Sequence, residues 1–513
     1  MTPRHSPSPR ATPRDLRAAI VLVVLLGIST LPVLAVDIPA GVDVPNHVAR
    51  MGVLSRSDDA PHPFYEVDWA LYPNLAMDLI VPVLAQVLPV DTATKVFFVA
   101  GQVLVVSGAA TVELAHKGRW QWSGLVALCW LYSVPFAWGF MNFTFGCGLA
   151  LWALACHLLL SDRRVAIRAA AHFAWVAALF VTHFFALGLF GVTAGLFEVS
   201  RVVQLRQTWR QAARHAVWLA APVLLLLTGL HITGGAVGGA GTTWAFAAKA
   251  LWLFTALNGY SWELSAGLMV CLSVLLWSAT RGGMVRVDCP GRCIGLGLTA
   301  LFLGMPFKLL DTAFVDVRVI VFTALVVPAF TTLRGTGTRR CRALAFGGGG
   351  LFFVNLAVVA GLQLSYDRSY DQLRESLTHI APRSRVLIGG SGDAGDPPVR
   401  LQDYPMYNAP LLAVHYRNAF SPTLFTAAGK QPVKAAAAVR PLDVPYGGPV
   451  PLRDLVAVAK GQRPSRPVPR FARNWVEDYD YLYVVGAHVR EPQAGPLEVL
   501  DVGERFVLYR IKG

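Results

Sequence analysis

The chain has 513 residues, of which 54% are hydrophobic and only 15% are charged. Globular domains carry about 25% charged residues, whereas the apolar residues here form blocks close to the roughly 20 residues that cross a hydrocarbon core. This composition excludes an ordinary water-soluble globular protein and predicts a polytopic membrane protein. The formal net charge of +14 does not indicate a nucleic-acid partner, because the basic residues concentrate in short loops rather than in a soluble patch.

The N-terminal segment, residues 1–15, is basic and rich in proline and serine, so we expect a disordered cytoplasmic tail. The apolar runs that follow predict about eleven membrane spans, which together form a transmembrane domain over residues 16–365. The first run is longer than the apolar region of a signal peptide, and we expect it to remain as a span. The expected spans are 16–36, 96–115, 123–138, 143–161, 168–182, 184–199, 216–232, 264–280, 293–310, 317–333 and 343–365.

One further apolar segment, residues 75–89, is short for a span and carries Asp78 and Pro82. Counting it as a span would place the basic loop 162–168 outside, against the rule that positive loops stay in the cytoplasm. We therefore expect an interfacial or re-entrant helix within a first outer loop, residues 37–95.

Loop charge predicts the orientation of the chain. If the N-terminus is cytoplasmic, every loop that returns to that side is rich in Lys and Arg, as cytoplasmic loops are. These basic loops are 116–120, 162–168, 201–215, 281–293 and 334–342. The remainder of the chain, residues 366–513, then lies outside the membrane on the opposite face.

That C-terminal part is polar and rich in proline. Residues 384–390 and 478–486 read as buried strands, 496–513 as a closing hairpin and 370–380 as an amphipathic helix. The predicted fold class is therefore mostly α: a polytopic transmembrane helical bundle with a C-terminal extracytoplasmic α/β domain.

Directly after the first span, the stretch "DIPAGVDVPNHVARMG" brings three ionisable side chains together. Asp43 suits a helix N-cap and Pro45 suits a first helical turn. A helix that begins there places Asp43, His47 and Arg50 on one face. A simple cap explains Asp43, and a polar site at the membrane surface explains all three residues.

The same outer loop contains a second acidic group, Glu66, Asp68 and Asp78, interleaved with aromatic residues. The aromatic residues are typical of an interfacial belt, and together with the carboxylates they also suit a sugar-binding platform. A later outer loop, residues 231–263, ends in an apolar segment bearing Lys249, which suits a mobile gate as well as a plain interfacial helix.

Four more polar residues lie at outer turns: Asn142, His183, Lys308 and Arg318. Arg318 departs from the positive-inside pattern, and an outward-facing guanidinium near a span end indicates an anion. The anion is either a phospholipid headgroup or the phosphate of a lipid-linked substrate. Asp316, two residues away, offers a third explanation, because it could simply neutralise Arg318.

The layout resembles the GT-C superfamily of polytopic glycosyltransferases, and in particular its bacterial members. A basic N-terminus and one span lead into an outer loop with an early carboxylate and a short juxtamembrane helix. The motifs "GFMNFTFGCGLAL", "THFFAL" and "DVRVIVF" follow, and a soluble outer domain ends the chain. The resemblance covers nearly the whole chain in layout and a few short motifs in residues, and the tail has no WWDYG-type motif.

The resemblance implies an inverting glycosyltransferase of the bacterial inner membrane. Such an enzyme moves a sugar from a polyprenyl-phosphate donor to a lipid, glycan or protein acceptor at the outer face. Asp43 matches the acidic residue of the first outer loop, Asp37 is the reserve, and Arg318 matches a cation that holds the donor phosphate. Glu66 and Asp68 match a second acidic site that some members use for a divalent cation, Mg²⁺ or Mn²⁺. The other candidate substrate-binding residues are His47, Arg50, Asn142, His183 and Lys308.

Two other functions fit the same layout. One is a transporter or flippase for a lipid-linked saccharide, although no inverted repeat is evident. The other is a non-catalytic subunit that assembles envelope polysaccharide.

Overall fold

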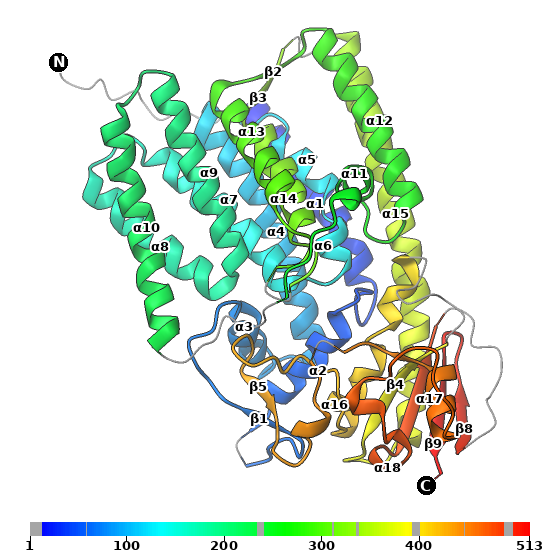
Figure 1. Ribbon diagram of the computed structural model, residues 1–513. Coiled ribbons are helices and arrows are strands. Elements are labelled where there is room, and N and C mark those ends of the chain that lie inside the picture. Colours follow the sequence, from blue (N-terminus) through cyan, green and yellow to red (C-terminus); the bar gives the residue numbers. More distant parts are fainter. Residues whose placement is uncertain are drawn as a thin grey trace.

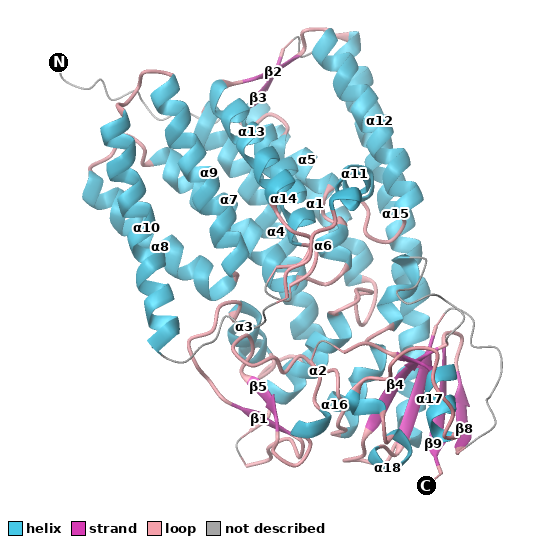
Figure 2. Cartoon of the chain, viewed as in Figure 1, coloured by secondary structure: helices cyan, strands magenta, loops and turns pink. Residues whose placement is uncertain are grey.

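The computed structural model describes residues 13–57, 59–232, 241–309, 312–334, 338–391, 401–445, 447–486 and 496–512. Long helices run side by side in one large bundle, and most of the strands lie beyond one end of it (Figure 1; Figure 2). The long helices are α1 (Pro13–Leu34), α4 (Val90–Lys117), α7 (Met141–Leu159), α8 (Val165–Thr182), α9 (Phe184–Val203), α10 (Trp209–Ile232), α12 (Trp262–Arg281), α13 (Cys289–Gly304) and α15 (Arg339–Ser376). The expected fold class, a mostly helical membrane bundle with a small C-terminal α/β part, is confirmed.

Eight helices within the described ranges are long and apolar enough to cross a membrane. Three of the expected spans are shorter than the sequence suggested. Residues 123–138 form two pieces, α5 (Ser123–Cys129) and α6 (Val134–Ala137), because Pro135 starts a new helix. Helix α13 has 16 residues. Residues 317–333 form α14 (Val315–Val326), a 3₁₀ turn that contains Pro328, and strand β3 (Thr331–Leu333).

The apolar segment 75–89 forms α3 (Ala76–Leu84), a helix of nine residues. At 1.5 Å per residue it is about 14 Å long, well short of the hydrocarbon thickness. It is therefore a short helix between α1 and α4 rather than a span, and its place at the outer face stays a prediction.

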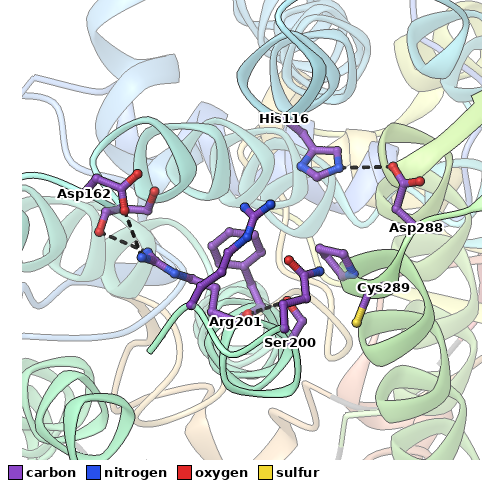
Figure 3. A pocket seen from close by; sticks show the side chains of 11 residues that line it. His116, Asp162, Ser200, Arg201, Asp288 and Cys289 are labelled. Atoms are coloured by element: carbon purple, nitrogen blue, oxygen red, sulfur yellow. Dashed lines mark hydrogen bonds and ion pairs between the residues drawn. The ribbon is translucent and has the colours of Figure 1, made fainter. Parts of the chain in front are cut away.

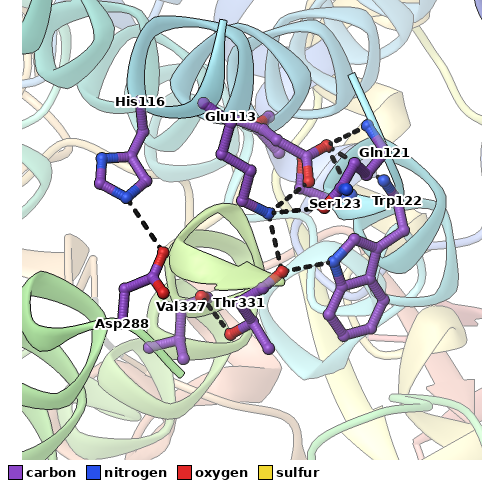
Figure 4. Close-up of polar contacts among 10 residues, drawn as sticks. Glu113, His116, Gln121, Trp122, Ser123, Asp288, Val327 and Thr331 are labelled. Carbon is purple, nitrogen blue, oxygen red and sulfur yellow. Dashed lines mark hydrogen bonds and ion pairs between the residues drawn. The ribbon is translucent and has the colours of Figure 1, made fainter. Parts of the chain in front are cut away.

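The basic loops gather at one end of the bundle, where β2 (Val285–Val287) pairs with β3 (Figure 1). Glu113 organises this end: its carboxylate accepts hydrogen bonds from the backbone N–H groups of Gln121, Trp122 and Ser123 at 2.9–3.2 Å, and it pairs with Lys117 at 2.8 Å (Figure 4). The Lys117 ammonium also donates to the Thr331 carbonyl at 2.7 Å. These bonds tie the turn after α4 to the strand after α14.

The longest helix, α15, joins the bundle to the C-terminal part. It has 38 residues, about 57 Å at 1.5 Å per residue, and it runs unbroken through residue 366. The expected domain boundary at 365/366 therefore lies inside a helix, and the predicted helix over 370–380 is a continuation of the last span.

The C-terminal part contains a five-stranded mixed sheet in the order β6-β4-β7-β9-β8. The central strand β7 (Tyr481–Val485) is buried along its whole length, as its continuous apolar run predicts. It lies parallel to β4 (Val386–Gly390) and antiparallel to β9 (Phe506–Ile511). The edge strands are β6 (Val450–Pro451) and β8 (Leu497–Val502), and the short helices are α16 (Leu412–Arg417), α17 (Leu452–Ala459) and α18 (Trp475–Asp478). All the strands expected from the sequence are present.

The first outer loop and the C-terminal part interlock. Strand β1 (Tyr65–Val67) of the loop pairs with β5 (Val433–Ala435). Helix α2 (Val44–Leu54) packs against α16, and its Asn46 amide donates to the Thr423 carbonyl at 3.0 Å and accepts from the Phe425 N–H at 2.9 Å. These two regions, which the sequence presents as separate, therefore form one structural unit.

The packing of α4 on α7 gives a test of the bundle. A Cβ at Gly148 would lie 2.7 Å from the Leu104 carbonyl carbon and 2.9 Å from the Val105 nitrogen, whereas a Cβ at Gly188 on α9 would meet nothing within 4 Å. Because backbone atoms cannot move aside cheaply, Gly148→Ala should destabilise the protein by about 1–3 kcal/mol. Gly188→Ala should be neutral or stabilising by up to about 1 kcal/mol. Thermal unfolding of both variants in detergent measures the difference, and equal midpoints would contradict the close packing of α4 and α7.

Candidate active site

The carboxylate of Asp43 does not cap the helix that it precedes. Asp43 holds the N-cap position of α2, yet its side chain makes no capping hydrogen bond. Its backbone N–H donates to the Trp138 carbonyl at 2.9 Å, which fixes the residue against the turn between α6 and α7. The interpretation of Asp43 as a simple cap is therefore wrong, because its carboxylate bonds to none of the N–H groups at the start of α2.

Asp43 is surrounded by protein, but part of its surface remains accessible. Burial raises the pKa of its carboxyl from 3.8 to about 7, and the charge of Arg318 opposes this rise. An acid with such a pKa is partly ionised at neutral pH. Asp43 can therefore both accept and release a proton under physiological conditions.

Arg318 lies on α14 and is only 4% exposed. Its guanidinium stacks over the Phe140 ring at 4.3 Å and lies 5.1 Å from the centre of the Phe143 ring. Nη2 donates to the Ala313 carbonyl at 3.3 Å, and Nη1 lies 3.4 Å from His183 Nε2. Nε has no hydrogen-bond partner among the described residues. A buried cation that retains a free donor is suited to bind an anion.

Asp316 does not neutralise Arg318. Two positions along a helix correspond to a rotation of about 200°, so the two side chains leave α14 on opposite faces. Asp316 instead pairs with Lys249 at 3.3 Å. The ammonium of Lys249 also donates to the carbonyls of Phe302 and Met305 at 2.8 and 2.6 Å. Lys249 thus links α11 (Phe246–Thr255) to α13 and α14.

His183 and Asn142 occupy neighbouring turns. His183 precedes α9, where its Nδ1 accepts from the Ala186 N–H at 3.4 Å. The side chain of Asn142 bonds to the backbone at the start of α3: its Oδ1 accepts from the Met77 N–H in the first turn at 2.9 Å, and its amide donates to the Asn74 carbonyl just before the helix. His183 therefore touches Arg318 directly, whereas Asn142 supports the loop beside it.

His47 and Arg50 lie on one face of α2, with Arg50 Nη2 3.4 Å from His47 Nδ1. Arg50 forms a buried ion pair with Asp78 at 2.8 Å, and both side chains are at most 2% exposed. This pair clamps α2 onto α3. Burial and the adjacent Arg50 charge lower the pKa of His47 to about 3, so its imidazole is neutral at physiological pH. The ring lies 5.4 Å from that of Phe425.

The other predicted site residues take part in contacts elsewhere. Asp37 pairs with Arg374 of α15 at 2.7 Å and is largely exposed. Lys308 exchanges backbone hydrogen bonds with Thr243 at 3.0 and 3.1 Å. Asp68 forms an ion pair with Lys434, which lies opposite Glu66 on β5.

Glu66 and Asp68 fit a divalent cation poorly. Mg²⁺ and Ca²⁺ need several oxygen ligands, and here an ammonium group already occupies one of two carboxylates. Within the described parts of the chain, no group of three His, Cys, Asp or Glu side chains could hold a metal ion. A divalent cation therefore stays a prediction, and no step below depends on one.

Sequence reasoning missed the aromatic residues and the amide that the C-terminal part contributes. The Trp138 ring lies 4.4 Å from Phe314 and 5.0 Å from Tyr404, so an aromatic contact joins the bundle to residues far along the chain. Asn408 Nδ2 lies 3.4 Å from Asp43 Oδ1. No local sequence signal identifies these residues, because their role depends on contacts across the fold.

A cavity of about 610 Å³ lies at the end of the bundle where the basic loops gather, away from the C-terminal sheet. Figure 3 shows the side chains that line it. Its charged groups are largely paired with one another: Arg201 with Asp162 at 2.9 Å and His116 with Asp288 at 3.3 Å. None of the predicted site residues lines it. We therefore take the surroundings of Asp43 and Arg318 as the candidate site.

No protein-family model and no curated protein matches the chain. The fold is similar to the crystal structure of ArnT from Cupriavidus metallidurans bound to undecaprenyl phosphate. The two superpose with a TM-score of 0.52 over 97% of this chain and 98% of that one, at 10% sequence identity. The chain thus shares the overall fold of ArnT along nearly its whole length.

The ion pairs formed by Asp78 and Asp68 should contribute differently to the free energy of unfolding. Asp78→Ala leaves the buried Arg50 guanidinium without a counter-charge and should destabilise the protein by about 3–5 kcal/mol. Asp68→Ala removes an exposed pair and should cost at most about 1 kcal/mol. Thermal unfolding of the two variants provides the comparison, and a small effect of Asp78→Ala would mean that the buried pair does not clamp α2 onto α3.

Proposed function

We propose that the protein is a membrane glycosyltransferase of GT-C type that takes a sugar from a polyprenyl-phosphate donor. The observation that carries the proposal is the placement of Asp43 and Arg318 in one buried region of an ArnT-like fold, close enough for the charge of Arg318 to act on Asp43. The solved structure of ArnT contains undecaprenyl phosphate, which supports a lipid of this class as the partner here.

The chemistry assigns one role to each of these residues. Asp43 acts as the general base and removes the proton from the acceptor hydroxyl. The acceptor oxygen then forms a bond to the anomeric carbon as the bond from that carbon to the phosphate oxygen breaks, which inverts the anomeric configuration. The electron pair leaves with the polyprenyl phosphate, whose charge the Arg318 guanidinium stabilises.

The surroundings support this division of roles. The rings of Phe140 and Phe143 stack on the guanidinium, and its buried Nε has no hydrogen-bond partner among the described residues, which supports a phosphate oxygen as its partner in the substrate complex. His183 lies beside Arg318 and His47 follows Asp43 on α2, so both are proposed as neutral substrate-binding groups.

The distribution of charge supports an orientation. The basic loops gather at the end of the bundle opposite the C-terminal sheet (Figure 1). Because basic loops stay in the cytoplasm, we place the N-terminus inside and the candidate site at the outer face of a bacterial inner membrane. The acceptor, a lipid, a glycan or a protein, then approaches from outside.

Replacement of the base tests the function. Asp43→Asn should lower the rate of sugar transfer by about 10²–10⁴-fold, because the amide cannot take the acceptor proton. Asp37→Asn is the matched control: it removes an exposed carboxylate and should retain activity within a few-fold. The assay follows release of polyprenyl phosphate in proteoliposomes supplied with a panel of labelled polyprenyl-phosphate sugars and acceptors. Full activity of Asp43→Asn, or no transfer by the wild-type protein with any donor, would refute the proposal.

The pH dependence of transfer tests the pairing of Asp43 with Arg318. Asp43 must be ionised to act as a base, so activity should rise with pH up to its pKa of about 7 and then level off. Arg318 lowers this pKa, so Arg318→Gln should move the rising limb to higher pH as well as reduce the maximum rate. A pH–rate profile for each protein makes the comparison. If the rising limb of Arg318→Gln stays at the wild-type pH, the charge of Arg318 does not act on the pKa of Asp43.

A further inference from the structure

The C-terminal part contacts the carboxylate of Asp43 through the amide of Asn408. Asn408 Nδ2 donates to the Val42 carbonyl at 2.9 Å and lies 3.4 Å from Asp43 Oδ1, across a separation of 365 residues in the chain. An amide nitrogen carries two hydrogens. One can serve the Val42 carbonyl while the other is directed at the Asp43 carboxylate.

The segment around Asn408 is held firmly in place. The Tyr370 hydroxyl of α15 donates to the Pro405 carbonyl at 2.9 Å, and the Leu411 N–H donates to the Asn408 carbonyl at 3.0 Å. The Tyr404 ring packs against Trp138, whose own carbonyl accepts the Asp43 N–H. The amide and the carboxylate are therefore positioned by the same group of contacts.

Among the described residues, the other charged and polar groups near Asp43 make no side-chain hydrogen bond to its carboxylate. Arg318 of α14 acts on Asp43 by its charge, but the two form no ion pair within 4 Å among the described residues. His47 on α2 lies near Arg50, and Arg50 is occupied by Asp78. His183, before α9, faces Arg318. Asn408 is the group whose side-chain nitrogen the structure places at hydrogen-bonding distance from an Asp43 oxygen.

We propose that Asn408 is a positioning residue, which holds one carboxylate oxygen of Asp43 so that the other faces the acceptor hydroxyl. The inference rests on the proposed function and deepens it, because the C-terminal part then completes the site instead of only covering it. The 3.4 Å contact is long for a neutral donor, as such contacts often are before substrate binds. It shortens when the carboxylate ionises, since hydrogen bonds to charged acceptors are shorter and stronger.

The ionisation of Asp43 can be measured without any sugar transfer. A hydrophobic carbodiimide reacts with protonated carboxyl groups, and peptide mass spectrometry of the full chain in detergent follows the adduct on Asp43 as a function of pH. The adduct should be absent from Asp43→Asn. Asn408→Ala removes the donor and should move the labelling midpoint up by about one pH unit. Asn408→Asp has nearly the same shape but adds a negative charge, and it should move the midpoint further.

Asn474→Ala provides the matched control. Asn474 is an exposed residue of the same C-terminal part and makes no capping hydrogen bond with its side chain, so the midpoint should stay at the wild-type value. Thermal unfolding establishes that each variant is folded. A wild-type midpoint in folded Asn408→Ala and Asn408→Asp would overturn the proposal, since a merely structural asparagine has no reason to change the titration of Asp43.

Transfer kinetics separate this inference from the proposed function. In Asn408→Ala we expect kcat to fall about tenfold with little change in KM, and the rising limb of the pH profile to move with the labelling midpoint. If Asp43→Asn abolishes transfer while Asn408→Ala keeps the wild-type kcat and limb, the inference fails and the function stands. If the wild-type protein transfers no sugar, the function fails, and the labelling experiment still decides whether Asn408 controls Asp43.

Discussion

The buried guanidinium of Arg318 is the group on which the rest of the candidate site depends. Removing a charge from water costs several kcal/mol unless partners replace the lost hydration. The protein supplies two aromatic faces, one backbone carbonyl, the imidazole of His183 and the long-range field of Asp43, but no carboxylate within ion-pair distance among the described residues. The compensation among the described residues is incomplete, which supports the proposal that Arg318 binds a phosphate.

The same reasoning explains why a nearby acid is occupied elsewhere. Asp316 could have neutralised Arg318, but the helical repeat directs it to the other face of α14, where Lys249 binds it. Lys249 in turn joins α11 to α13 and α14. The Lys249–Asp316 ion pair thereby fixes the helix that carries Arg318 without neutralising the Arg318 guanidinium.

The carboxylate side of the site is built from opposite ends of the chain. Asp43 follows the first span, whereas Asn408 and Phe425 belong to the C-terminal part. The β1–β5 pair, the contacts of Asn46 and the Arg50–Asp78 clamp hold α2 between α3 and that part. Because burial raises the pKa of Asp43 toward neutrality, this enclosure also gives the carboxylate its capacity to exchange a proton.

The sequence by itself determined the membrane class, most of the long helices, the strands of the C-terminal part and the candidate pair Asp43 and Arg318. The helices and strands follow from local composition and from hydrophobic length and periodicity, whereas the pair Asp43 and Arg318 is implied by the resemblance to GT-C glycosyltransferases. Only the tertiary structure decided that Asp43 is not a simple cap, that Arg50 and Asp68 are taken up by ion pairs, that α15 crosses the expected boundary and that Asn408 touches Asp43. Each of these depends on which side chains meet across the fold, and a hydrogen bond or an ion pair between distant residues leaves no periodic trace in a single sequence.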